Sequence, residues 1–101
     1  MIDEIIHEIH GKIERMRAIA TEGNFGGELA FVLQDAPHGI EEALDTGSYI
    51  LLTDKNYGYP ACATRYLQGK LGDYAADARR AGLIREYITK LEEITELAKK
   101  L

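Results

Sequence analysis

Apolar residues recur every three or four positions along the first twenty residues of the chain. They step 4-3-4-3-4 through Ile2, Ile6, Ile9, Ile13, Met16 and Ala20, and Ile5 and Ile19 widen the stripe. Such spacing places the apolar side chains on one face of an α-helix and the polar ones on the other. The pattern predicts an amphipathic helix over 2–21, about 30 Å long.

The end of the chain carries a second stripe of the same kind. It steps 3-4-3-4-3 through Ile84, Tyr87, Leu91, Ile94, Ala98 and Leu101. We expect a helix that is capped by Asp73 and runs to the end of the chain, about 40 Å long. Because the stripes match, we expect the two terminal helices to pack antiparallel. A stripe this long is hard for a small monomer to cover, so the sequence also predicts a homo-oligomer that associates through these helices.

Residues 28–45 fit two structures. Apolar steps of 4-3-4-3 favour a helix, although the run over 28–33 is also typical of a buried strand. Pro37 falls inside the helical pattern, where proline removes a hydrogen bond and clashes with the carbonyl of Leu33. We therefore favour a helix with a break or kink at 34–37, and expect Asp35 to cap a second helical piece over 36–45.

The middle of the chain holds the best strand candidate. Residues 49–53 are aromatic or branched and are bounded by turn residues. They are interpreted either as one arm of a short β-hairpin within 49–59 or as an extended connector. Pro60 suits the first turn of a following helix, and the apolar steps from Leu67 to Ala81 cross two glycines, which is compatible with one helix or two. The fold class is mainly α: a small bundle of four to five helices that forms a single domain over 1–101.

Composition narrows the class of protein. The chain has 101 residues, 46% apolar and 29% charged, which is typical of a folded globular domain. Its one cysteine, Cys62, excludes an internal disulfide and a cysteine-based metal centre. No apolar run is long enough for a bilayer, and the N-terminus opens with Asp3 and Glu4 instead of positive charge. We expect a cytoplasmic protein that does not bind membranes.

Charge is unevenly distributed along the sequence. The net charge is −5, yet residues 18–54 contain no Lys or Arg, and their acidic residues are Glu22, Glu28, Asp35, Glu41, Glu42, Asp45 and Asp54. Such a segment repels phosphate, so nucleic acid is not an expected partner. The segment is interpreted as a solvated face beside the chain's own basic C-terminal helix, as a surface for a basic protein partner, or as a head-to-tail contact with a second copy.

Candidates for catalysis and metal binding are weak. Glu4 and His7, like Asp35 and His38, have the carboxylate-x-x-His spacing of bundle metal sites, but nothing in the sequence supplies the remaining ligands. Ser48 is the only serine and lacks a nucleophile motif, and Cys62 is interpreted as a small packed residue. We expect no enzyme activity, no metal and no cofactor.

Aromatic residues concentrate near the centre of the chain. Tyrosine and arginine together are typical of binding hot spots and of pockets for flat or phosphorylated ligands. The candidate site residues are Tyr49, Tyr57, Tyr59, Arg65 and Tyr66. Two functions follow. The first is a non-catalytic acidic interaction protein that oligomerises through its terminal helices and binds a protein partner. The second is a small-molecule protein that holds a nucleotide-like anion in a Tyr- and Arg-lined pocket.

Overall fold

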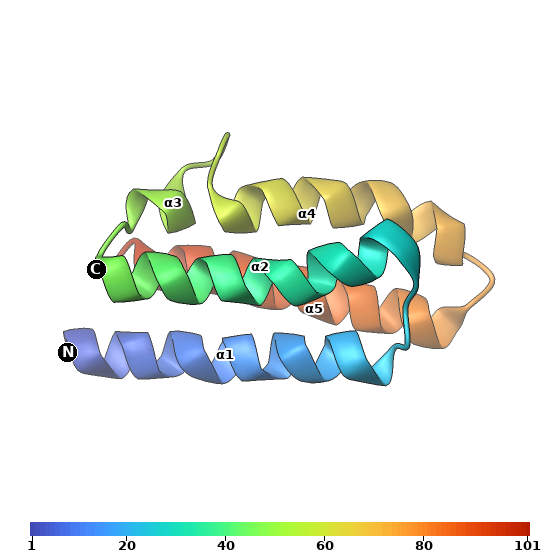
Figure 1. The fold of residues 1–101 in the computed structure, drawn as a ribbon, viewed down its shortest axis with the longest axis horizontal. Helices are drawn as coiled ribbons and strands as arrows, with labels where there is room; N and C mark the ends of the chain where they lie inside the picture. The colour runs from blue at the N-terminus through green and yellow to red at the C-terminus, as the bar shows by residue number, and fades with distance from the viewer.

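Four long helices run alternately up and down the long axis of the molecule (Figure 1). A computed structural model describes residues 1–101, and the dimensions are 42 × 24 × 19 Å. The elements are α1 (Ile2–Glu22), α2 (Gly27–Thr46), α3 (Ile50–Thr53), α4 (Tyr59–Lys70), the 3₁₀ helix η1 (Leu71–Tyr74) and α5 (Ala78–Ala98). Helix α1 lies beside α2 and α5, and α4 lies beside the same two, so the four helices form a closed ring. The predicted helical bundle, with its terminal helices antiparallel, is confirmed.

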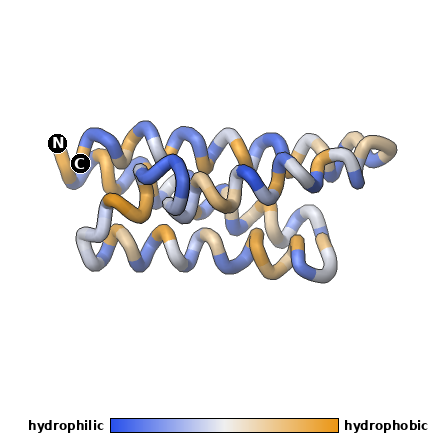
Figure 2. Tube along the Cα trace, turned by 90° about the horizontal axis from the view of Figure 1, so that it is seen from above, coloured by the Kyte–Doolittle hydropathy of each residue, from blue (hydrophilic) through white to orange (hydrophobic).

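The two predicted stripes meet inside the bundle. Ile9, Ile13 and Met16 of α1 are fully buried, as are Ile84 and Leu91 of α5. Apolar and polar positions alternate along each helix, as Figure 2 shows. The stripes therefore form the core of a single chain. Self-association through the terminal helices stays a prediction. The central residues of both stripes are covered by the chain's own helices, whereas Ile2 at the end of the first stripe is exposed.

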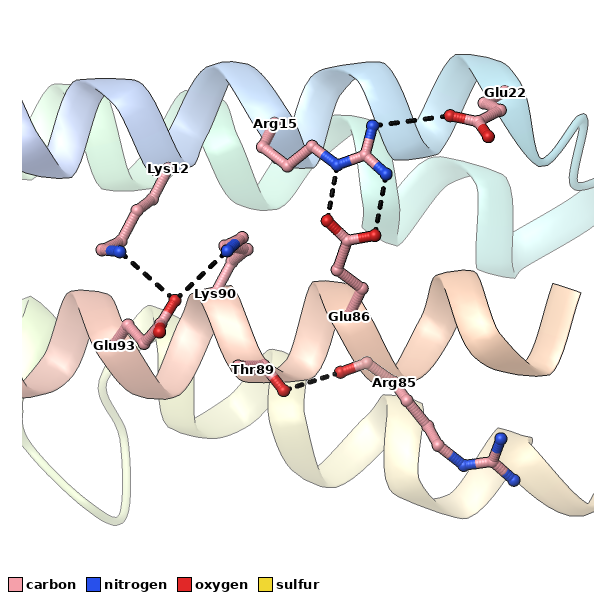
Figure 3. A network of polar contacts seen from close by, with 8 residues as sticks. All are labelled: Lys12, Arg15, Glu22, Arg85, Glu86, Thr89, Lys90 and Glu93. Atoms are coloured by element: carbon pink, nitrogen blue, oxygen red, sulfur yellow. Dashed lines mark hydrogen bonds and ion pairs between the residues drawn. The ribbon is translucent and has the colours of Figure 1, made fainter. Parts of the chain in front are cut away.

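A polar seam joins α1 to α5 along the outside of this contact (Figure 3). Arg15 binds Glu86 through two hydrogen bonds, of 2.5 Å from Nε and 2.7 Å from Nη2. The carboxylate of Glu93 forms ion pairs with Nζ of Lys12 at 3.3 Å and with Nζ of Lys90 at 3.4 Å. The hydrogen bonds from Arg15 lower the pKa of Glu86 below its usual value. These pairs are partly exposed, so their main effect is to fix the alignment of the two helices.

Helix α2 is continuous through Pro37, so a break at 34–37 is wrong, and a kink there stays a prediction. Proline at this position leaves the carbonyl oxygen of Leu33 without its helical N–H donor. The hydroxyl of Tyr87, from α5, donates to that oxygen at 2.8 Å across the core. The buried carbonyl is satisfied by a residue far along the chain, and the helix does not need to end. Asp35 consequently lies on the outer face of α2 and caps nothing.

The segment 49–59 is not a hairpin, and the structure contains no strand. Residues Ile50–Thr53 form a single helical turn that buries Leu52 in the core. The carboxylate of Asp54 then accepts the backbone N–H groups of Asn56 at 2.7 Å and Tyr57 at 3.0 Å, which closes a tight turn. This local turn and the burial of Leu52 replace the pairing partner that a strand would need.

The cap of the last helix is Asp77 and not Asp73, which lies within η1. The Asp77 carboxylate accepts the backbone N–H of Arg80 at 3.0 Å and its guanidinium at 2.9 Å. These contacts, the backbone N–H first, lower the pKa of Asp77. The apolar steps between 67 and 81 thus belong to two helices that η1 separates. No helix in the fold combines the length and apolar character that crossing a bilayer requires.

Candidate binding groove between α2 and α4

An open groove of about 420 Å³ runs between the antiparallel helices α2 and α4. Both walls follow helical spacing, because residues three or four apart share a face of a helix. The α2 wall consists of Phe31, Val32, Asp35, Ala36, His38, Gly39 and Glu42. The α4 wall consists of Tyr59, Cys62, Ala63 and Tyr66. The groove therefore joins the acidic segment of the sequence to part of its tyrosine-rich segment.

Small residues keep the groove open, and aromatic rings provide its apolar surface. A side-chain carbon at Gly39 would lie 3.3 Å from the ring of Tyr59, so the absence of a side chain there lets the ring pack against α2. Phe31 is 66% exposed and Tyr59 is 42% exposed. Large apolar side chains this exposed on a concave surface are typical of a binding site.

The charged members of the groove are acidic. Asp35 and Glu42 line it, and no Lys or Arg does. Within the acidic segment, Glu22 pairs with Arg15 and Glu41 pairs with Arg17, so the internal ion pairs of this segment go to α1 and not to the C-terminal helix.

Four exposed carboxylates of α2 have no ion-pair partner. They are Glu28, Asp35, Glu42 and Asp45. Arg17, by contrast, lowers the pKa of Glu41 through its hydrogen bonds. Asp54, the last acidic residue of the segment, caps the turn before α4. Within the segment 18–54, the carboxylates that lack an ion pair or a role in a turn thus lie on the outer face of α2.

The predicted cluster of tyrosines and arginine is divided among separate places. Tyr59 and Tyr66 line the groove. Arg65 lines a different, polar depression and donates to the carbonyl oxygens of Lys55 at 2.9 Å and Asn56 at 2.5 Å. Tyr57 is 81% exposed on the loop before α4, and Tyr49 packs against the core. Only two of the five candidate residues therefore share a surface.

Tyr66 spans the boundary between the groove and the protein interior. Its ring lines the groove, with the Nζ atom of Lys70 5.4 Å from the ring centre. Its hydroxyl is buried and has no hydrogen-bond partner. Burial raises the pKa of this hydroxyl, and the nearby Glu28 carboxylate adds to the effect. The hydroxyl is the one buried side-chain polar atom of the molecule without a partner.

The groove contains a thiol and an imidazole but no assembled catalytic pair. Cys62 is exposed, which corrects the expectation that it is packed, and its Sγ atom lies 3.4 Å from Nη2 of Arg65. His38 faces the same groove without a hydrogen bond to that thiol. No three side chains of the His, Cys, Asp and Glu types are placed to hold a metal ion.

Sequence reasoning missed Phe31, which is more exposed than Tyr59, the other large aromatic residue of the groove with an exposed ring. A signal for it is present in the spacing of the acidic segment. The outer face of α2 follows steps of 3-4-3-4-3 through Glu28, Phe31, Asp35, His38, Glu42 and Asp45. That polar stripe lies opposite the apolar stripe that begins at Leu29. Phe31 is its one large apolar residue, and this departure from the polar pattern is the signal.

The chain matches no protein-family model, no curated protein and no solved structure.

Proposed function

We propose that this protein is a non-catalytic interaction module that binds a basic segment of a protein partner in the groove between α2 and α4. The observation that carries the proposal is the exposed ring of Phe31 between the unpaired carboxylates of Asp35 and Glu28. An apolar anchor site flanked by one sign of charge favours a partner that offers apolar side chains and the opposite charge.

A nucleotide-like anion suits this groove poorly. Its charged walls are Asp35 and Glu42, which repel phosphate. Arg65, the cation that the anion hypothesis needs, is outside the groove and is engaged with two backbone carbonyls. Moving it would leave those carbonyls without their donor. The geometry thus supports the protein-partner hypothesis over the small-anion alternative.

A second copy of the chain is also a poor occupant through this surface. Two copies facing each other across α2 would bring like charges together, since the whole segment 18–54 lacks Lys and Arg. Like charges in an interface oppose association. These charges oppose a symmetric pairing through α2, and we propose a different, basic protein as the partner. We propose a reducing, cytoplasmic setting for the interaction, in keeping with the single free thiol of Cys62.

The native thiol offers a direct test. Cys62 is the only cysteine, it is exposed, and it lines the groove, so an occupant should shield it from a thiol reagent such as dithiobisnitrobenzoate. The probe is an 18-residue peptide of leucine and lysine, and its control replaces each lysine with glutamate. We expect the lysine peptide to slow the modification of Cys62 in a saturable way and the glutamate peptide to leave the rate unchanged.

Matched variants distinguish binding in the groove from nonspecific binding to other exposed apolar residues. Phe31→Ala should weaken binding of the lysine peptide about thirtyfold or more, because truncating an aromatic hot spot costs about 2 kcal/mol or more. Ile50→Ala is the control, since Ile50 is 67% exposed on α3, outside the groove. Equal affinity of both variants, or modification rates that no peptide alters, would contradict the proposed function.

A further inference from the structure

The geometry points to an amphipathic helix as the occupant of the groove between α2 and α4, with basic residues repeated every seven positions along it. This inference rests on the proposed function and specifies the chemistry and conformation of the partner segment. Three features support it: the nature of the walls, the length of the groove and the spacing of the carboxylates.

The walls offer nothing to an extended chain. Both are α-helices whose backbone groups are bonded within the helix, apart from the Leu33 carbonyl, which Tyr87 holds in the core. The structure also has no sheet edge. A peptide that adds to a sheet gains its affinity from main-chain hydrogen bonds, which are not on offer here. A helical segment makes its backbone hydrogen bonds within itself, so it leaves no backbone group unpaired when it enters the groove.

The groove is long enough for three turns of a helix. The α2 wall extends from Phe31 to Glu42, which is about 16 Å. Ala36 and Ala63 are small lining residues, and the ring of Tyr59 packs over Gly39. The exposed parts of the Phe31 and Tyr59 rings are available to contact a bulky apolar residue of the occupant.

The carboxylates set the register of the basic residues. Glu28, Asp35 and Glu42 are seven residues apart, so they lie on one face of α2 at intervals of about 10.5 Å. All three are exposed and none has an ion-pair partner within the chain. A second helix that packs along α2 at a shallow angle meets them with side chains that are also seven residues apart. Lysine or arginine at those positions supplies the missing counter-charge.

The test compares three peptides of closely matched composition. The first has leucines at three- and four-residue spacing and lysines every seven residues on the flank. The second has the same residues with the lysines five apart, which spreads them around the helix. The third is the first with one central proline, which disrupts the helix. Affinities are measured by calorimetry, and placement in the groove by protection of Cys62.

We expect the first peptide to bind about tenfold more tightly than either of the others, which corresponds to about 1.4 kcal/mol. Asp35→Asn should reduce the affinity of the first peptide about fivefold and leave the second nearly unchanged, because only the first places a lysine opposite Asp35. Glu96→Gln is the charge control, since Glu96 is an exposed carboxylate of α5 outside this groove.

The outcomes distinguish this inference from the function on which it rests. If no peptide protects Cys62, the groove is not a docking site and both fail. If all three peptides protect Cys62 with similar affinity, the groove binds basic segments but does not select a helix or a spacing, and only the inference is overturned. If the first peptide is still preferred to the same extent after Asp35→Asn, its lysines do not pair with the carboxylates of α2 as assigned, and the inference about their spacing is overturned.

Discussion

The hydroxyl of Tyr87 donates a 2.8 Å hydrogen bond to the carbonyl oxygen of Leu33, the oxygen that Pro37 deprives of its helical donor. The two residues belong to helices on opposite corners of the ring, α5 and α2, so this bond crosses the core. Tyr87 has no exposed surface, and burial raises the pKa of its hydroxyl, which therefore remains a donor at any ordinary pH. A proline inside one helix is thus accommodated by a tyrosine from another.

Replacing Tyr87 by Phe should lower the free energy of unfolding by about 1 to 3 kcal/mol, because the buried carbonyl of Leu33 loses its only donor. Urea denaturation measures the change. In a Pro37→Ala background the restored N–H of residue 37 reaches the same carbonyl, so the Tyr87→Phe change should cost clearly less there. Identical costs in the two backgrounds would show that the proline and the tyrosine are not coupled.

Tyr66→Phe also removes a buried hydroxyl, but here we do not expect the free energy of unfolding to fall. The hydroxyl of Tyr66 is buried without a hydrogen-bond partner, so deleting it removes a desolvation penalty. We expect a stability equal to the parent protein or up to about 1 kcal/mol greater. Tyr87→Phe is the matched comparison in the same denaturation experiment. A loss of stability in Tyr66→Phe would indicate a hydrogen bond to the nearby Glu28 carboxylate.

The stability of the fold should fall in acid. The pKa of Glu86 is lowered by hydrogen bonds from Arg15, and the pKa of Glu41 by hydrogen bonds from Arg17. A carboxylate whose pKa is lower in the folded state binds fewer protons there than in the unfolded chain. Its contribution is therefore present above the unfolded value, 4.5 for Glu, and is lost as the pH falls through the folded value.

Melting temperatures between pH 7 and pH 2 test this dependence. We expect these two groups to contribute a constant amount from pH 7 to about 5.5 and a declining amount below the Glu value of 4.5. In the Glu86→Gln variant the melting temperature at pH 7 should fall only slightly, since an exposed pair contributes less than about 1 kcal/mol. Its decline in acid should be shallower than that of the parent. An equally steep decline in both proteins would contradict the assignment.

Leu91→Asp should unfold the chain, because Leu91 is fully buried in the core where α5 packs against the other helices. A charge there would lack any partner, at a cost of more than about 4 kcal/mol. Circular dichroism gives the fold and light scattering the mass. Thr89→Asp, at an exposed position of the same helix, is the control and should remain folded. A wild-type oligomer that Leu91→Asp converts to a folded monomer would instead establish association through the terminal stripes.

The sequence predicts the terminal helices well because their stripes report burial directly. The sequence-based prediction fails where a residue far along the chain changes the effect of a local pattern. The effect of Pro37 cannot be judged without Tyr87, which lies 50 positions later and whose position depends on the finished fold. The expected hairpin fails for a different reason: no local pattern shows that the core has a place for Leu52.

The tyrosine cluster shows why nearness in sequence is a poor guide to a site. Arg65 and Tyr66 are consecutive, yet successive residues of a helix point about 100° apart, so they face different grooves. The groove itself could have been sought in the acid spacing of Glu28, Asp35 and Glu42. What the spacing cannot supply is the opposing wall from α4, since the packing of α2 beside α4 is a property of the whole bundle.

The two chain ends lie close together at one end of the bundle in both Figure 1 and Figure 2. The contact between α1 and α5 joins residues more than 70 positions apart in the sequence, although the ends of the two helices lie side by side. A circular permutant that links the ends by a short flexible loop, and opens the chain between η1 and α5, would turn this contact into a helical hairpin. The same opening makes the contacts of α5 with α3, α4 and η1 remote in sequence, so the contact order does not fall. The permutant should therefore refold no faster than the parent, while retaining the intact α2–α4 pair.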